Sequence, residues 1–474
     1  MKYSVVIGLE IHAQLLTNSK MFCSCSAKFG SAPNTNICPV CTAQPGSLPV
    51  INSKAVEHAV KTAIALNCRI NKESVFSRKN YFYPDLPKGY QISQYDQPLA
   101  EDGWVEVATK GNDPKRIGIK RAHLEEDAGK NTHNYDDSSV DLNRAGVPLL
   151  EIVSEPDIRS PQEAVAYFKK IKAVLECLGT CACNMEEGNL RCDANISLMP
   201  EGSKTFGTRA EIKNLNSFRF LEKALNYEIK RQTEILDSGG KIDQETRLFD
   251  AVQDTTRSMR KKEQANDYRY FPEPDLMPLV LEQDYIDQVK KMMPELPDAK
   301  RQRMSAQYML CSYDAEILSS DTALALYYEE LVAKTDEPKL SSNWMQTEVM
   351  RILNERKISI DELNLSSLQL SQLILMIKDG TINQNTAKDV FNEMLNSGKD
   401  AKIIVQEKGL SQIQDESAIE KIVEEVITSS PEQIQQYKDG KTNIMGYLVG
   451  VVMKKTKGKA NPQIVNALLK KKLD

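Results

Sequence analysis

The sequence lacks the motifs of the common nucleotide-binding folds and of serine hydrolases. It has no G-x-x-x-x-G-K-[ST] phosphate loop, because the run Gly440-Lys441-Thr442 is not preceded by the required glycine. A G-x-G-x-x-G dinucleotide motif and a G-x-S-x-G nucleophile elbow are also missing. Any nucleotide chemistry in this chain must therefore use a different kind of fold.

Histidine and long apolar runs are scarce as well. There are only four His, so a hydrolase dyad would have to use His12 or His123. No run reaches the roughly 18 apolar residues that a membrane span requires. Glu10 also interrupts the N-terminal apolar stretch, which is too short for a signal peptide. We therefore expect a cytoplasmic protein without a membrane partner.

What the sequence does contain is typical of a globular protein with several domains. The 474 residues are 41% hydrophobic and 27% charged, which is close to the globular average. This length suggests roughly three domains. The net charge of −5 is unevenly distributed, because residues 441–474 contain eight Lys and a single Asp. This basic end predicts a polyanionic partner.

Short strands dominate the first 290 residues, and each is alternating or β-branched and bounded by turn residues. We expect strands at residues 3–12, 117–126, 149–153, 190–198 and 208–214, and helices at 54–66 and 161–178. This mixture predicts an α+β fold with a mainly antiparallel sheet. Residues 1–290 are therefore expected to form one domain.

Beyond Pro278 the apolar residues recur at helical spacing. We expect helices at residues 323–333, 342–354 and 365–378, then a polar linker near 408–417, and four more helices at 419–429, 431–437, 444–455 and 462–472. The sequence thus predicts an all-α domain over residues 291–407 and a small basic helical tail over residues 408–474.

Two close cysteine pairs, Cys23 with Cys25 and Cys38 with Cys41, are separated by a 12-residue loop. In a reducing compartment such pairs indicate a metal site rather than disulfides. The spacing suits a tetrahedral zinc site, and four protein ligands would close the coordination sphere, so the site would be structural. The alternative is that these are buried free cysteines, and the pairing favours zinc.

Several expected strands carry charged side chains on one face. In residues 3–12 the odd positions are apolar, whereas Glu10 and His12 share the even face. The same alternation groups charged residues on three further strands: Arg121, His123 and Glu125; Arg191 and Asp193; Arg209, Glu211 and Lys213. One alternative is the ordinary solvent-facing side of an antiparallel sheet. Carboxylates with a His suit Mg²⁺, and the cations suit phosphate, so we favour a face for phosphoryl transfer.

Several longer runs resemble the GatB family, which supplies one of the subunits of aspartyl/glutamyl-tRNA amidotransferases. They are residues 7–14 (IGLEIHAQ), 78–90 (RKNYFYPDLPKGY), 121–127 (RAHLEED), 140–153 (VDLNRAGVPLLEIV) and 211–217 (EIKNLNS). The resemblance implies a cradle domain similar to glutamine synthetase, then a helical domain and a YqeY-like tail. It further implies a heterotrimer with an amidase subunit, GatA, and a small subunit, GatC.

The resemblance also implies the reaction. A GatB-like subunit uses ATP and Mg²⁺ to phosphorylate the side-chain carboxylate of misacylated Asp-tRNA(Asn) or Glu-tRNA(Gln). Ammonia from the amidase subunit then displaces phosphate. The sequence does not distinguish between the two tRNA substrates.

The resemblance also implies a role for individual residues in each of the matching motifs. The expected catalytic residues around Mg²⁺ are Glu10, His12, Glu125 and Glu151, with Asp193 and Glu211 in or next to that shell. The expected phosphate contacts are Lys79, Arg144 and Lys213. The expected zinc ligands are Cys23, Cys25, Cys38 and Cys41. The expected tRNA contacts of the tail are Lys454, Lys455, Lys457 and Lys459.

Two other functions remain open on the sequence. One is a non-enzymatic, zinc-bearing scaffold that binds tRNA, which explains the tail and the cysteine loop but not the recurring charges on separate strands. The other is a self-contained ATP-dependent ligase that modifies tRNA, for which the chain lacks visible nitrogen-donor chemistry.

Overall fold

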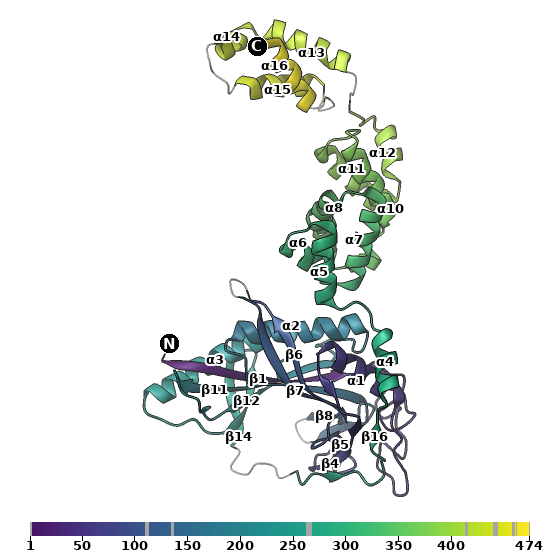
Figure 1. Ribbon diagram of the computed structural model, residues 1–474, viewed down its shortest axis with the longest axis vertical. Helices are drawn as coiled ribbons and strands as arrows, with labels where there is room; N and C mark the ends of the chain where they lie inside the picture. Colours follow the sequence, from purple (N-terminus) through teal and green to yellow (C-terminus); the bar gives the residue numbers. More distant parts are fainter. Residues whose placement is uncertain are drawn as a thin grey trace. The chain divides into compact units, whose positions relative to one another are not determined.

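The computed structural model describes residues 2–109, 113–133, 137–261, 268–412, 416–438, 444–456, 460 and 462–473. The chain divides into two compact units, Met1–Pro297 and Asp298–Asp474, whose elements are labelled in Figure 1. No helix among these residues is long and apolar enough to cross a membrane.

The first unit is built on a nine-stranded sheet with the order β14-β13-β12-β11-β1-β10-β7-β6-β2. Its strands are β1 (Tyr3–Gln14), β2 (Arg69–Ile70), β6 (Ala100–Val107), β7 (Lys115–Glu126), β10 (Pro148–Ser154), β11 (Leu190–Pro200), β12 (Ala210–Lys213), β13 (Glu245–Asp250) and β14 (Thr255–Lys261). Neighbouring strands are antiparallel except for the parallel pair β12–β13. The predicted α+β fold with a mainly antiparallel sheet is confirmed.

Period-2 alternation gives β1 one buried apolar face and one polar face. Ile7, Leu9 and Ile11 are almost completely buried in the core, and Glu10 and His12 point to the other side. Helices α1 (Ser53–Ala65), α2 (Pro161–Leu178) and α3 (Phe218–Asp237) contact the sheet and contribute buried side chains to the same core. Figure 1 shows α2 lying across one face of the sheet, so the charged face is left open.

A β-bulge interrupts the alternation beside the centre of the sheet. Val153 of β10 pairs with Arg121, but Ser154 pairs with Ile119, so Lys120 has no partner in the register. The residues predicted to share a face of this strand, Arg121, His123 and Glu125, all lie beyond the bulge, so it does not disturb their common phase. Where the ladder is disturbed, the backbone N–H of Leu9 donates to Ser154 Oγ at 2.9 Å, which satisfies a group that would otherwise be buried unpaired.

Shorter sheets border the open face. They are β15-β4-β5, the pair β16-β3 and the pair β8-β9. Their strands are β3 (Glu73–Ser74), β4 (Phe76–Asn80), β5 (Tyr90–Gln94), β8 (Lys130–His133), β9 (Ser138–Asp141), β15 (Phe271–Pro272) and β16 (Leu279–Val280). Strand β5 contacts β7, which brings Ser93 and Lys79 of this small sheet to the charged residues of β7.

The remaining described elements are helical, as predicted. They are α4 (Gln283–Lys291), α5 (Pro297–Tyr308), α6 (Ser312–Leu318), α7 (Thr322–Thr335), α8 (Pro338–Trp344), η1 (Met345–Val349), α9 (Met350–Arg356), η2 (Ile360–Glu362), α10 (Ser367–Lys378), α11 (Gln384–Ser397), α12 (Ala401–Glu407), α13 (Glu416–Ser429), α14 (Pro431–Lys438), α15 (Ile444–Lys455) and α16 (Pro462–Leu473). The uninterrupted helix expected at residues 342–354 instead contains the π-helical turn η1.

Buried apolar side chains gather in three clusters. One lies between the sheet and its helices, one contains residues 304–405, and one contains residues 419–473 of the tail. The boundaries expected at residues 290 and 407 stay a prediction, because the chain divides into compact units only after Pro297.

Candidate active site

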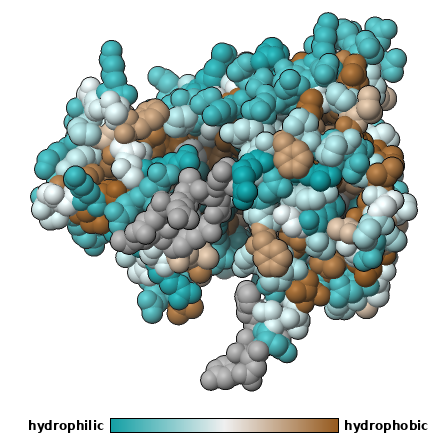
Figure 2. All heavy atoms as spheres, turned by 90° about the horizontal axis from the view of Figure 1, so that it is seen from below, coloured by the Kyte–Doolittle hydropathy of each residue, from teal (hydrophilic) through white to brown (hydrophobic). Residues whose placement is uncertain are grey.

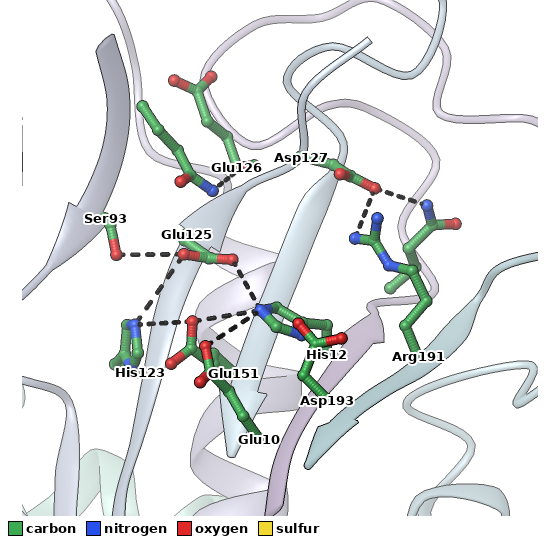
Figure 3. A network of polar contacts seen from close by, with 12 residues as sticks. Glu10, His12, Ser93, His123, Glu125, Glu126, Asp127, Glu151, Arg191 and Asp193 are labelled. Carbon is green, nitrogen blue, oxygen red and sulfur yellow. Dashed lines mark hydrogen bonds and ion pairs between the residues drawn. The ribbon is translucent and has the colours of Figure 1, made fainter. Parts of the chain in front are cut away.

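Three adjacent strands bring a histidine and three carboxylates together on the open face. His12 of β1 lies opposite Glu151 of β10, which in turn lies opposite His123 of β7. His12 Nε2 is 3.3 Å from a Glu151 oxygen and 3.8 Å from oxygens of Glu10 and Glu125. Figure 3 shows these side chains converging from the neighbouring strands. We call this group of Glu10, His12, Glu125 and Glu151 the acidic cluster.

Burial and mutual repulsion shape the protonation of the cluster. Burial, reinforced by the charge of Glu151, raises the pKa of Glu10 to about 7. Burial also raises the pKa of Glu125. For His12, burial would lower the pKa, but the hydrogen bond and charge of Glu151 outweigh it and raise the pKa to about 9. In the absence of a metal the imidazolium of His12 therefore compensates part of the negative charge.

Two sets of side chains in this region have the composition and spacing of a cation site. The donor atoms of Glu10, His12 and Glu151 all lie within 4.8 Å of one another, as do those of His123, Glu125 and Glu151. Carboxylate oxygens are the ligands that Mg²⁺ prefers, so the acidic cluster fits a hard divalent cation. Glu125 is held in place by Ser93, whose hydroxyl donates to it at 3.2 Å.

His123 was not among the expected site residues, although the sequence groups it with Glu125. Its side chain is only 2% exposed, and burial lowers its pKa to about 4. His123 Nε2 lies 3.7 Å from Glu151. A neutral His123 thus lies beside Glu125 and Glu151 of the acidic cluster, and its phase on β7 was the signal that could have identified it.

The expected phosphate contacts line the same cavity. This central cavity has a volume of about 440 Å³, and its lining includes Glu10, His12, Lys79, Glu125, Arg144, Asp193 and Lys213. Burial would lower the pKa of Lys79, but the charges of Glu125 and Glu151 outweigh it and raise the pKa. Seen from the side opposite α2, hydrophilic side chains border a hollow in the first unit (Figure 2).

Asp193 and Glu211 form ion pairs with a lysine, whereas the carboxylates of the acidic cluster gather around His12. Both carboxylates pair with Lys213, Asp193 closely and Glu211 at 3.1 Å. Arg144 lies 3.6 Å from Asp127, a buried carboxylate that also pairs with Arg191 at 3.0 Å. Asp127 was not an expected site residue, and it fixes two arginines at the edge of the central cavity.

The four cysteines of the predicted zinc site meet in space. The sulfur atoms of Cys23, Cys25, Cys38 and Cys41 all lie within 4.8 Å of one another. Lys20, which is completely buried, has its Nζ 3.5 Å from Cys41 Sγ. The hydrogen bond from Cys23, helped by the charge of Lys20, lowers the pKa of Cys41 to about 4. This thiolate environment fits a bound zinc ion.

The basic residues expected to contact tRNA are described only in part. Lys454 and Lys455 lie in the last turn of α15, and Lys455 pairs with Glu425 at 3.2 Å. Lys457 and Lys459 lie outside the described residues.

Comparisons with known proteins agree over almost the whole chain. Residues 5–287 match the family described as GatB/GatE catalytic domain, and residues 326–473 match the family described as GatB domain. A protein of Thermodesulfovibrio yellowstonii is 57% identical over 470 residues, and the match covers 99% of both chains. A protein of Syntrophotalea carbinolica is 53% identical over 473 residues, covering 100% of this chain and 99% of the relative. Both are named as the same subunit of an aspartyl/glutamyl-tRNA(Asn/Gln) amidotransferase.

Proposed function

The chain belongs to the GatB family, and from this membership we propose that it is the subunit that activates misacylated tRNA for amide formation. It acts on Asp-tRNA(Asn), Glu-tRNA(Gln) or both. The side-chain carboxylate attacks the γ-phosphorus of ATP, and ADP leaves. Ammonia then attacks the acyl phosphate carbon, and inorganic phosphate leaves.

The observation that carries this proposal is the acidic cluster itself. Glu125 and Glu151 have side chains only 3% and 5% exposed, and burying carboxylates beside one another is costly unless cations compensate. A scaffold surface would function without these buried carboxylates. A site that binds metal ions and phosphate requires them as metal ligands, and the bound cation would compensate their charge. This contrast favours an enzyme over the alternative of a zinc-bearing tRNA-binding scaffold.

The roles proposed for the residues follow from charge and position. Glu10, His12, Glu125 and Glu151 would hold Mg²⁺, which when bound would supply positive charge to neutralise phosphate. Lys79, Arg144 and Lys213 hold phosphate oxygens or the aminoacyl end. Asp193 and Glu211 orient Lys213, to which both are paired.

The nitrogen source is proposed to lie on a partner chain. The relatives are named as one subunit of an amidotransferase, which supports a complex of several subunits. We assign glutamine hydrolysis to the amidase subunit GatA, with GatC as the third member of a heterotrimer. The described domains of this chain then supply tRNA binding and carboxylate activation.

The test is ATP cleavage that depends on misacylated tRNA. The chain, purified with its amidase partners, is incubated with Mg²⁺, γ-labelled ATP and either Asp-tRNA(Asn) or Glu-tRNA(Gln), without glutamine. We expect cleavage with at least one tRNA. We expect His12→Ala and Glu125→Ala to reduce it by about 100-fold or more while tRNA binding stays within about twofold.

Glu106→Ala is the matched control, because Glu106 is an exposed carboxylate on β6 of the same sheet. It is expected to retain wild-type cleavage. Cleavage that persists in both site variants, or that is absent from the wild type, would contradict the proposal and favour the scaffold.

A further inference from the structure

A lysine beside the cysteine cluster is completely buried. Lys20 has no exposed surface, and its ammonium donates to Cys41 Sγ at 3.5 Å and to the carbonyl oxygen of Leu142 at 3.1 Å. Within the described residues, no carboxylate forms an ion pair with it. Burial of an ammonium group is costly unless a negative charge compensates it. Lys20 therefore needs such a charge nearby, and the cysteine cluster is in position to supply it.

A zinc ion held by the four cysteines would leave this negative charge. Zinc binds cysteine as the thiolate, and four thiolates outweigh the charge of one divalent ion. The proposed site is therefore negative overall when zinc is bound. Groups next to metal ligands commonly donate hydrogen bonds to them and adjust their charge. The position of Lys20 thus fits a donor to the zinc-bound thiolate of Cys41.

The second acceptor of Lys20 belongs to the connection between β9 and β10. This connection, residues 142–147, contains Arg144, and we call it the Arg144 loop. Gly146 of the loop has a φ of +87°, and a Cβ there would lie 3.5 Å from Lys20 Cδ and 3.6 Å from Cys41 Cβ. The Arg144 loop therefore packs directly against the lysine and against one of the cysteines.

The segment between the two cysteine pairs is bonded to the same loop. Asn34 Oδ1 accepts from the backbone N–H of Leu142 at 2.8 Å, and the backbone N–H of Asn36 donates to Asn143 Oδ1 at 2.8 Å. The side-chain amide of Asn143 donates to the carbonyl oxygen of Ala32 at 2.7 Å. Since one metal ion would fix the cysteines on both sides of this segment, zinc binding restrains the segment and, through it, the Arg144 loop.

The loop in turn determines where the guanidinium of Arg144 lies. Arg144 lines the central cavity and donates to the carbonyl oxygens of Ala128 at 3.0 Å and Gly129 at 2.6 Å. These contacts fix the end of the side chain, whereas its backbone depends on the loop. A displacement of about 1 Å in a group that positions a substrate can cost about 100-fold in rate. The backbone of the Arg144 loop must therefore be held as firmly as the guanidinium.

We infer that Lys20 is a positioning residue that joins the zinc site to the Arg144 loop, so that zinc binding sets the position of Arg144 in the central cavity. Its ammonium compensates the thiolates on one side and holds the loop on the other. The part assigned to Arg144 rests on the proposed function, whereas the link between the metal and the loop does not. The zinc site thus contributes to the reaction without touching a substrate.

Hydrogen exchange measured by mass spectrometry tests the link. The complex with its amidase partners is compared with the same complex after a chelator has removed zinc, and with Lys20→Met, which keeps a long side chain without its charge. Both changes are expected to speed exchange of residues 142–147 by about tenfold or more, while β1 keeps its wild-type protection. Lys28→Met, which changes an exposed lysine of the cysteine segment, should have no effect.

The chelated wild-type complex keeps this test decisive even where Lys20→Met fails to fold. Unchanged protection of the Arg144 loop after zinc removal would overturn the inference. An equal loss of protection in β1 would also overturn it, because zinc would then support the whole domain rather than this loop.

Zinc affinity provides the second measurement. In competition with a colorimetric chelator, Lys20→Met is expected to bind zinc about tenfold or more weakly than the wild type, as is found when a partner of a metal ligand is removed. Lys28→Met should bind zinc like the wild type. Wild-type zinc affinity in Lys20→Met, or a wild-type complex that binds no zinc, would refute the role of Lys20.

A double-variant cycle connects Lys20 to Arg144. Lys20→Met and Arg144→Met are each expected to lower tRNA-dependent ATP cleavage by about tenfold or more. The double variant should stay within about twofold of Arg144→Met, because Lys20 acts through Arg144. Losses that multiply would overturn the inference. A wild-type complex without tRNA-dependent cleavage would contradict the proposed function, and exchange and zinc affinity would still decide the link.

Discussion

His12 lies among three carboxylates, and this arrangement links metal binding to a proton. The metal-free pKa of His12 is raised to about 9, since the hydrogen bond and charges of the neighbouring glutamates outweigh its burial. A histidine binds a metal only as the neutral imidazole. With His12 as a ligand, as proposed, metal binding at neutral pH would displace a proton from it.

We accordingly predict that Mg²⁺ affinity rises with pH. Between pH 7 and the metal-free pKa of His12, about 9, each unit of pH should increase affinity by up to about tenfold, and above it the increase should level off. Below about pH 7 the slope should be steeper, because Glu10, whose pKa is raised to about 7, must then also lose a proton. Calorimetric titration of the complex with Mg²⁺ at several pH values measures this slope. His12→Gln, which cannot carry the proton, should reduce the slope, and a wild-type affinity independent of pH would argue against His12 as a ligand.

At this scale, the sequence predicts which residues share a strand face but not which strands are neighbours. Alternation in β1 was enough to pair Glu10 with His12. The contact between His12 and Glu151 depends on β10 lying beside β1, and nothing in local spacing sets that order. The β-bulge at Ser154 was equally invisible, because one extra residue changes the phase of Lys120 without changing the composition of the strand.

Among the elements, the segment between β1 and α1 has the least regular structure. From Leu15 to Asn52 it contains no helix and no strand, yet Phe22 and Cys41 in it are buried. Scattered backbone hydrogen bonds, such as those from Met21 N–H to Gly146 and from Val50 N–H to Phe22, hold parts of this segment, and the cysteine cluster brings residues 23–25 to residues 38–41. We therefore propose that the zinc site contributes to the order of this segment.

We predict about one zinc per chain in the purified protein, measured by elemental analysis. Cys38→Ser should lose most of this metal and make residues 15–52 more susceptible to limited proteolysis, because folding of the segment and metal binding are coupled. Cys311→Ser is the matched control, because Cys311 is exposed and distant in sequence. Equal zinc content in the two variants would disprove the assignment.

The sequence predicted the helices of this region, but it did not predict the π-helical turn that interrupts one of them. Helical spacing and the proline at the first position of α2 reproduce its bounds, Pro161–Leu178. An α-helix and a π-helical turn differ by one residue in hydrogen-bond spacing, so the apolar pattern that indicates residues 342–354 cannot distinguish between them. The interruption at Met345–Val349 is therefore seen only in the structure.

For the whole molecule, the main asymmetry is the distribution of charge. The chain carries a net charge of −5, although residues 441–474 are strongly basic. Part of this basic charge is compensated within the tail, because Lys455 pairs with Glu425 and Lys472 with Glu420. The proposed contact with tRNA would therefore depend on the lysines that remain available, and Lys454 is expected to contribute more than Lys455.

We predict that changing Lys454, Lys455, Lys457 and Lys459 to Gln weakens tRNA binding and reduces its salt dependence. Each lost phosphate contact should lower the slope of log affinity against log salt by about 0.7 to 0.9. Filter binding at several salt concentrations measures this slope. Lys2→Gln/Lys339→Gln removes two exposed lysines outside the tail and should leave the slope unchanged. An unaltered slope in the tail variant would exclude these lysines from the contact set.

Strand β1 also determines which changes in chain length the protein can accept. Its twelve residues, Tyr3–Gln14, are held in a fixed register with β10 and β11, and two of them, Glu10 and His12, line the central cavity. Inserting one residue would exchange the buried and open faces of everything beyond it, and inserting two would restore the faces but displace the groups by about 7 Å. Insertions and deletions should therefore be confined to the connecting loops, because the number of peptide bonds in one strand sets which side chains of β1 face the charged side chains of β10 and β11.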